Sequence, residues 1–274
     1  MVNLKTIIKN LIKTEDDQKR HLSLNISRQE IKSEGIPAAF DGFKIAFLSD
    51  LHGTWHPQLL SALKKEKTDL VLIGGDYFDG VYPAEEGLML LNELSKTYFV
   101  AGVSGNHELY RKDWPELEKA TSEMVCWLNN RSVLLDRNGS KLRICGFSDP
   151  GDLRKEQLVD IFEEFKNQVS TIPKSGLFTI ALVHRPDLSL LADRKDFNLI
   201  LSGHKHGGQW RFFGIGIAGP GLQGNVDLFP KYNAGLYKLN HSEMYVSRGL
   251  GDQMWIPRIF NNPDLVMITL RSSK

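Results

Sequence analysis

Nine residues of the types that bind divalent metal ions stand in five short blocks of the chain. Five of the eight histidines belong to these blocks, together with three aspartates and one asparagine. The residues are Asp50, His52, Asp76, Asp79, Asn106, His107, His184, His204 and His206. Taken alone, each block also suits a turn or a surface loop. Together, and in this order, they predict a site for two metal ions.

Spacing within the blocks indicates which residues could bind the same metal ion. Asp50 and His52 lie two positions apart after an apolar stretch, so an extended backbone would point both side chains to one ion. Asp76 follows two glycines, which allow a close backbone approach, and its carboxylate can bridge two ions. Asn106 and His107 are adjacent and point apart, so one can bind metal while the other faces the substrate.

The remaining histidines follow two apolar stretches in the second half of the chain. His184 comes after one of them, and His204 and His206 flank Lys205 after the other. Imidazole and carboxylate ligands together suit manganese, iron or zinc, and we expect manganese. A structural zinc site is disfavoured because no cysteine lies near the blocks.

The elements that must position these blocks alternate between strand and helix. Apolar stretches that predict buried strands precede the blocks, and helical patterns separate the first three of them. The predicted strands are 44–48, 69–73, 98–103, 178–183 and 197–201, and the predicted helices are 57–66, 83–94 and 114–127. This rhythm predicts a parallel sheet covered by helices, with ligands at the carboxyl ends of its strands.

The second half of the chain has a different mixture of elements. A hairpin is expected around Asn138 and Gly139, followed by a helix over residues 153–169. Further strands, which we expect to be antiparallel, are predicted at 207–213, 234–239, 244–247 and 265–270. The simplest arrangement is an α/β fold with two packed sheets and helices outside.

The ordered blocks resemble the calcineurin-like metallophosphoesterase superfamily, whose five blocks are all present between Asp50 and His206. Three later segments resemble the YkuE/YaeI-like phosphodiesterase branch of that superfamily and extend the match over residues 41–274. These segments are 203–209 (GHKHGGQ), 245–251 (YVSRGLG) and 257–263 (PRIFNNP). The resemblance implies a four-layer α/β/β/α sandwich with two mixed sheets.

The resemblance also implies a role for each residue. Asp50, His52 and His206 would hold the first metal, while Asn106, His184 and His204 would hold the second. Asp76 would bridge the two ions. His107 would remain unligated beside the leaving oxygen, oriented by Asp79.

Elementary chemistry agrees with these implied roles. Two divalent ions would neutralise phosphate charge and lower the pKa of a bridging water toward ~7, so that its hydroxide attacks phosphorus. His107 would act as general acid for the leaving oxygen, and Asp79 would raise its pKa and fix its orientation.

Two positions differ from relatives within the superfamily. Protein phosphatases carry an arginine directly after the second aspartate of the second block, where this chain has Gly80. Without that phosphate clamp, a bulkier diester suits the site better than a monoester. Purple acid phosphatases use a tyrosine ligand at the place of Asp79, whereas Tyr77 here should point away. A phosphomonoesterase and a non-catalytic metal-binding scaffold remain as alternatives.

The branch resemblance suggests small-molecule or lipid-linked phosphodiesters and pyrophosphates as substrates. Side chains downstream of the last block could shape a pocket for the leaving group, although packing and solvent exposure explain them equally well. These are Arg211, Phe212, Phe213, Trp255 and Arg258.

Composition places few further limits on function. The chain has 274 residues, 41% of them hydrophobic, and a formal net charge of +1, so nothing global points to nucleic-acid binding. Cys126 and Cys145 match no zinc or redox spacing, which indicates two buried thiols in a reducing compartment.

Residues 1–40 form a predicted N-terminal extension before a catalytic domain over 41–274. Within it, apolar residues at helical spacing alternate with Lys5, Lys9 and Lys13. Such a basic amphipathic helix over residues 1–13 suits an anionic membrane surface, and it equally suits packing on its own domain or on a second subunit. Since no membrane span or secretory signal is visible, we expect a cytoplasmic protein that touches the inner membrane face at most peripherally.

Overall fold

The structure is a computed structural model, and it describes residues 23–151, 153, 158–223, 225–251 and 257–273. The predicted amphipathic helix of residues 1–13 lies outside the described residues. Among these residues, the structure contains no helix that is long and apolar enough to cross a membrane.

The first of two large sheets contains six strands and is mixed. Four neighbouring strands, β2 to β5, are parallel, as the alternation of strand and helix predicts, while β15 runs antiparallel to β2 and parallel to β1. In spatial order the strands are β1 (Asn25–Ser33), β15 (Asp264–Ser272), β2 (Lys44–Leu48), β3 (Leu70–Gly74), β4 (Phe99–Val103) and β5 (Cys126–Trp127).

The second large sheet is also mixed, and a small third sheet stands beside it. Strands β14, β9, β8 and β7 are parallel, with antiparallel strands at both edges. The second sheet has the order β13 (Gly235–Lys238), β14 (Glu243–Val246), β9 (Leu199–Ser202), β8 (Thr179–Val183), β7 (Ser140–Phe147) and β6 (Arg131–Arg137). The third sheet is antiparallel and contains β10 (Trp210–Phe212), β11 (Ile215–Pro220) and β12 (Val226–Leu228).

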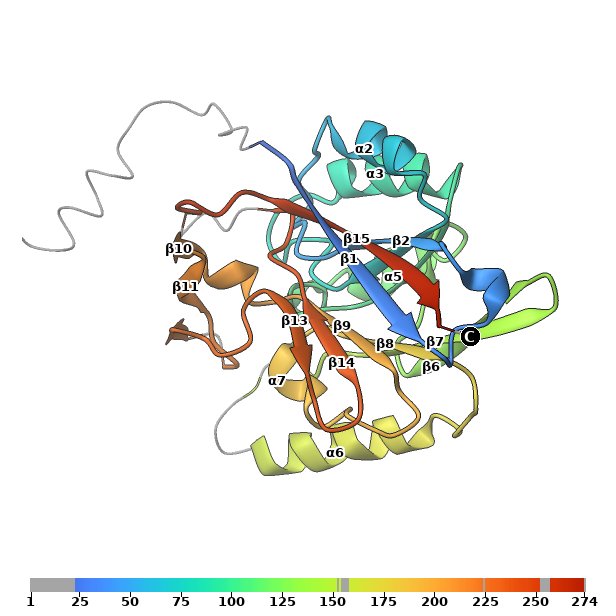
Figure 1. The fold of residues 1–274 in the computed structure, drawn as a ribbon. Coiled ribbons are helices and arrows are strands. Elements are labelled where there is room, and N and C mark those ends of the chain that lie inside the picture. Colours follow the sequence, from blue (N-terminus) through green and yellow to red (C-terminus); the bar gives the residue numbers. More distant parts are fainter. Residues whose placement is uncertain (1–22, 152, 154–157, 224, 252–256, 274) are drawn as a thin grey trace, which may run out of the picture.

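Three hydrophobic clusters hold four layers together, because successive side chains of a strand point to opposite faces. On β2, Ile45 and Phe47 join the cluster between the two sheets, whereas Ala46 and Leu48 join the cluster beneath the helices of the first sheet. A third cluster packs α6 on the second sheet. Figure 1 shows α2 and α3 above the strands and α6 below them. The predicted four-layer sandwich with two mixed sheets is confirmed.

The helices cover the outer faces and occupy short connections near the strand ends. The described residues also form two 3-10 turns. The elements are η1 (Ala38–Phe40), α2 (Leu59–Glu66), α3 (Glu85–Ser95), α4 (Asn106–Tyr110), α5 (Trp114–Ala120), α6 (Leu158–Thr171), α7 (Pro186–Ser189) and η3 (His206–Gly208).

The helix predicted over residues 114–127 is shorter than expected. It ends at Ala120, and the following residues turn to bring Cys126 and Trp127 into the first sheet as β5. Thr121 stabilises this turn, because its hydroxyl donates to the carbonyl of Leu117 and accepts the indole N–H of Trp127 at 2.9 Å. Tertiary pairing therefore overrides the helical pattern of the sequence.

The N-terminal part of the described chain is built into the first sheet. Strand β1 lies within residues 1–40, which we predicted to be an extension, and it pairs along its whole length with β15. The predicted boundary near residue 40 therefore falls after a strand that belongs to the first sheet.

Candidate metal centre

The backbone turns sharply at five of the predicted ligands. Asp50, His52, Asp76, His204 and His206 all have a positive φ, between 45° and 68°. Non-glycine residues rarely adopt this left-handed conformation, which costs of order 1–3 kcal/mol each. The extended backbone predicted for the first block is thus wrong, because both of its residues follow the end of β2. The sharp turns fold the side chains inward toward a common centre.

One group of side chains gathers around Asp50. The ligand atoms of Asp50, His52 and His206 lie within 4.8 Å of one another. Nε2 of His52 is 3.1 Å from Nε2 of His206, which is 3.7 Å from Oδ1 of Asp50. Two bonds hold the carboxylate, since it accepts the Ser49 hydroxyl at 2.6 Å and the backbone N–H of His204 at 2.8 Å. This geometry leaves three ligand atoms facing one point.

A second group gathers around Asp76 and contains His184 and His204. Nε2 of His184 lies 3.2 Å from Oδ2 of Asp76 and 3.2 Å from Oδ1 of Asn106. Its other ring nitrogen faces the carbonyl of Gly74 at 2.8 Å, so that nitrogen carries the proton and Nε2 is directed at the cluster. Asp76 also forms a third group with His52 and His107, which places its carboxylate between the two main groups.

The carboxylate of Asp79 contacts two histidines at once. Its Oδ2 atom lies 3.2 Å from Nδ1 of His52 and 3.3 Å from Nδ1 of His107. Its other oxygen accepts the backbone N–H groups of Val81 and Tyr82, which fixes the carboxylate in the loop. The sequence predicted the contact with His107 and missed the one with His52. Asp79 therefore orients a predicted metal ligand as well as the predicted general acid.

His107 differs from the other histidines of the centre in its accessibility. Its side chain is 23% exposed, whereas those of His52, His184 and His206 are at most 3% exposed. Its backbone N–H donates to Asp76 Oδ1 at 2.8 Å, which ties the start of α4 to the second block. The imidazole of His107 thus stands at the solvent side of the centre, where a substrate would arrive.

Neighbouring carboxylates raise the pKa of two histidines of the centre. Burial disfavours the imidazolium of His184, but Asp76 and Asp50 outweigh it and raise its pKa to about 10. For His107, Asp76 and Asp79 likewise overcome burial and raise the pKa to about 9. Buried carboxylates that keep neighbouring imidazoles protonated can also attract a metal ion. Such an ion can replace the protons on those imidazoles.

His204 and His206 have the opposite character and suit neutral ligands. Burial, together with positively charged neighbours, lowers the pKa of both His204 and His206 well below the usual range. Both imidazoles are therefore unprotonated at neutral pH and need lose no proton to bind a metal. The described donor set of carboxylates, imidazoles and one amide oxygen fits divalent ions such as manganese, iron or zinc.

The elevated pKa of His184 leads to a prediction about metal uptake. Below about pH 10 this imidazole carries a proton that an ion must displace, so binding releases protons and metal affinity rises with pH, about tenfold per unit for each displaced proton. We expect Mn²⁺ titration of chelated protein at pH 7.5, by calorimetry in two buffers of different ionisation enthalpy, to show proton release. A His184→Gln variant should release fewer protons, and equal release would contradict the assignment.

Comparison with known proteins identifies the family. A family model described as calcineurin-like phosphoesterase matches residues 43–208. The chain belongs to the calcineurin-like phosphoesterase family. Membership implies divalent metal ions and a phosphoesterase hydrolase, and the clustered aspartates and histidines of this phosphoesterase supply ligand groups for such ions.

Several bacterial proteins are similar over most of the chain. Metallophosphoesterase YkuE of Bacillus subtilis is 29% identical over 91% of the chain and 86% of its own length. Metallophosphoesterase Cj0846 of Campylobacter jejuni is 29% identical over 89% of the chain, which spans only 64% of that protein. Phosphodiesterase YaeI of Escherichia coli is 27% identical over 83% of the chain and 82% of its own length.

Glu108 is a residue of the centre that our sequence reasoning did not assign. It is fully buried, and its two carboxylate oxygens accept the backbone N–H groups of Asp76, Phe78 and Gly105 at 2.7–2.9 Å. These bonds clamp the loop after β3 to the loop after β4. Glu108 follows His107 directly, and this position just after a strand-end block was the available signal.

Removing the acceptors of Glu108 should destabilise this phosphoesterase. In Glu108→Gln one carboxylate oxygen becomes an NH₂ group that faces backbone donors, so we expect the free energy of unfolding to fall by about 1–3 kcal/mol. Urea denaturation of chelated protein measures the change. Glu123→Gln, at an exposed glutamate, is the matched control. Equal stability of the two variants would refute the clamp.

A buried ion pair supports the other side of the centre. Arg185 follows His184 directly, and both it and Asp149 are almost fully buried. The guanidinium donates to the carboxylate at 2.8 and 3.1 Å, and also to the carbonyls of Gly151 and Leu222. Arg185 thereby joins the end of β8 to two loops beside the second group of ligands.

The downstream residues suggested for a leaving-group pocket lie in different places. Arg258 is buried, with Nη2 at 3.3 Å from Nδ1 of His206, so it borders the first group of ligands. Arg211 binds the backbone of Gly207 and the side chain of Asn233. Phe212 and Phe213 are exposed, and Trp255 lies outside the described residues.

Proposed function

We propose that this phosphoesterase is a phosphodiesterase that uses two divalent ions, with His107 as the general acid. The contact of His107 with Asp79, beside two ligand groups that Asp76 connects, carries the proposal. Asp50, His52 and His206 would hold one ion, while Asn106, His184 and His204 would hold the other and Asp76 would contact both. Manganese is the proposed metal. The similarity to phosphodiesterase YaeI of Escherichia coli supports this activity.

The bound ions would supply charge neutralisation for the phosphate and an activated water nucleophile. The residues of the chain supply the proton for the leaving oxygen. With a pKa of about 9, the imidazole of His107 holds a proton at neutral pH, and its exposed side can reach a substrate oxygen. Asp79 holds Nδ1 of that ring, so Nε2 is the nitrogen that would donate.

The surroundings of His107 favour a diester over a monoester. Gly80 occupies the place of the arginine that clamps the more highly charged monoester in protein phosphatases. Beside it stands Tyr110, which is 50% exposed, with its ring centroid 5.7 Å from that of His107. The Cβ atom of Tyr110 is the atom that a side chain at position 80 would approach most closely. An aromatic ring at this place, instead of a cation, suits the uncharged organic group of the second ester. That group could belong to a small or a lipid-linked substrate.

A comparison of two chromogenic substrates tests this proposal. Chelated protein should be inactive, and after addition of Mn²⁺ it should hydrolyse bis-p-nitrophenyl phosphate at least about tenfold faster than p-nitrophenyl phosphate. Preference for the monoester would support the alternative of a phosphomonoesterase. Absence of turnover on both substrates, with two ions bound per chain, would support a non-catalytic scaffold.

A further inference from the structure

The third sheet carries a concentration of exposed apolar side chains that the proposed chemistry does not use. We call these residues the aromatic tip. They come from β10, β11, β12 and the segment before β15, and they are Phe212, Phe213, Ile215, Val226, Leu228, Phe229 and Phe260. Phe213 is fully exposed and Phe260 is 79% exposed. Burying so many large apolar side chains would be strongly favourable, which marks the tip as an interaction surface.

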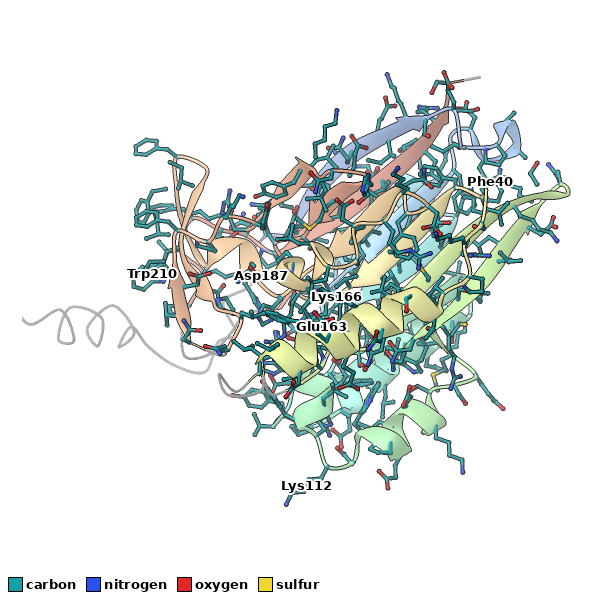
Figure 2. The ribbon with its side chains drawn as sticks, turned by 90° about the horizontal axis from the view of Figure 1, so that it is seen from below. Phe40, Lys112, Glu163, Lys166, Asp187 and Trp210 are labelled. Atoms are coloured by element: carbon teal, nitrogen blue, oxygen red, sulfur yellow. The ribbon has the colours of Figure 1, made fainter. Side chains whose placement is uncertain are left out.

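The fold makes the tip project. Phe213, Phe229 and Phe260 all have a positive φ near 50°. Phe213 lies in the turn between β10 and β11, and the backbone bends at Phe229 and Phe260. The rings of Phe212 and Phe260 meet edge to face, with centroids 5.4 Å apart, which joins separate segments of the tip. Figure 1 shows β10 and β11 standing away from the four layers, and Figure 2 shows Trp210 of the same sheet far from Phe40 in the core between the two large sheets.

The shape and size of the tip favour lipid over a protein partner. A standard protein interface uses about 20–30 residues on each side and packs them into a complementary surface. The tip offers seven side chains, which stand on strands of only three to six residues and on the turn and bends beside them. A bilayer requires no complementary shape, and it takes up protruding aromatic rings at the boundary of headgroups and acyl chains.

The N-terminal segment enters the fold at the base of the tip. Ser23, the first described residue, accepts a hydrogen bond from the side chain of Asn262 at 3.0 Å, two positions from Phe260. Asn25 donates from its backbone to Pro263 at 2.8 Å. The chain that leads from Ser23 back to residues 1–13, with their apolar sequence pattern and Lys5, Lys9 and Lys13, therefore joins the described fold beside the tip. Exposed Lys231, two residues after Phe229, adds positive charge at its rim.

We propose that the aromatic tip inserts into the surface of an anionic bilayer and that residues 1–13 bind the same surface. Neither element alone needs to anchor the protein, because stable peripheral binding commonly combines two weak signals. The chain runs from His206 through η3 directly into β10, so docking brings the metal centre next to the lipid surface. The docking does not depend on the proposed phosphodiesterase chemistry, and its test requires no substrate.

Vesicle sedimentation of the full chain tests the proposal. We expect the wild-type protein to bind vesicles of phosphatidylglycerol and phosphatidylcholine in equal amounts. The triple variant Phe213→Ser/Phe229→Ser/Phe260→Ser should bind at least about tenfold more weakly. The matched control Val159→Ser/Met89→Ser/Leu134→Ser removes exposed apolar side chains elsewhere and should bind within about twofold of wild type. Thermal melting of each variant shows whether it is folded.

Two further measurements separate insertion from indirect effects. A Phe213→Trp variant should show a blue-shifted emission with vesicles, beyond that of the wild-type protein, and quenching by brominated lipids. Light scattering reports the oligomeric state without lipid. Absence of vesicle binding by the wild type, equal binding by the tip variant, or a change from dimer to monomer in that variant would overturn the proposal, the last in favour of a protein interface.

Discussion

Replacement of His107 by glutamine should lower kcat by about 10²–10⁴-fold while two metal ions stay bound. The side chain of His107 contacts Asp79 and lies on the accessible side of the centre, and only its backbone N–H supports Asp76. The substitution therefore removes the proton donor and leaves the ligand groups in place. Turnover of bis-p-nitrophenyl phosphate by Mn²⁺-loaded protein, with metal content measured on the same sample, checks the result.

The dependence on the leaving group distinguishes a proton donor from a residue that only binds phosphate. p-Nitrophenolate leaves readily without a proton, whereas an unsubstituted phenolate is a stronger base and gains more from an acid. The loss in His107→Gln should therefore be greater for a phenyl ester than for a p-nitrophenyl ester of the same phosphate. His241→Gln, the same change at an exposed histidine, is the control. Equal losses for both leaving groups, or loss of metal, would show that the role of His107 is different.

The sequence predicts which side chains come together better than it predicts the backbone conformation that brings them together. Apolar strands that each end in a polar block predict convergence of these blocks at the carboxyl ends of the strands. The structure bears this out for Asp50 and Asp76, which follow β2 and β3 of the first sheet, whereas His184 reaches Asp76 from β8 of the second sheet. The left-handed backbone at Asp50 and His52 could not be predicted from their residue types, because neither aspartate nor histidine requires that conformation. They arise from tertiary bonds such as that from the backbone of His52 to Asp76.

Contacts that join distant segments were the least accessible to sequence reasoning. The sharing of Asp79 between His52 and His107 depends on how three loops pack, and no spacing within one block reveals it. The same holds for the clamp formed by Glu108. Of the third sheet, only a strand over residues 207–213, which includes β10, was expected, because strands as short as β10 and β12 bury too few side chains to produce a regular alternation.

Replacement of Asp76 by asparagine should abolish activity and weaken the binding of both ions. Its carboxylate is the only one among the described residues that belongs to groups with both His52 and His184, and it lies 3.2 Å from the latter. An amide of the same shape offers a single oxygen and no negative charge, so two cations held close together would lose the anion that screens their repulsion. We expect less than about one hundredth of the wild-type turnover, even with excess Mn²⁺.

Asp50→Asn provides the matched comparison, because Asp50 belongs only to the group with His52 and His206. That variant should lose one ion and keep the other, whereas Asp76→Asn should lose both after dialysis. Metal analysis of the two variants therefore separates a bridging carboxylate from a terminal one without any assay of activity. Two ions retained by Asp76→Asn would exclude the bridging role, and a single ion lost from each variant would place Asp76 in one group alone. Because Asp76 belongs to groups with both His52 and His184, we expect that only its removal empties both.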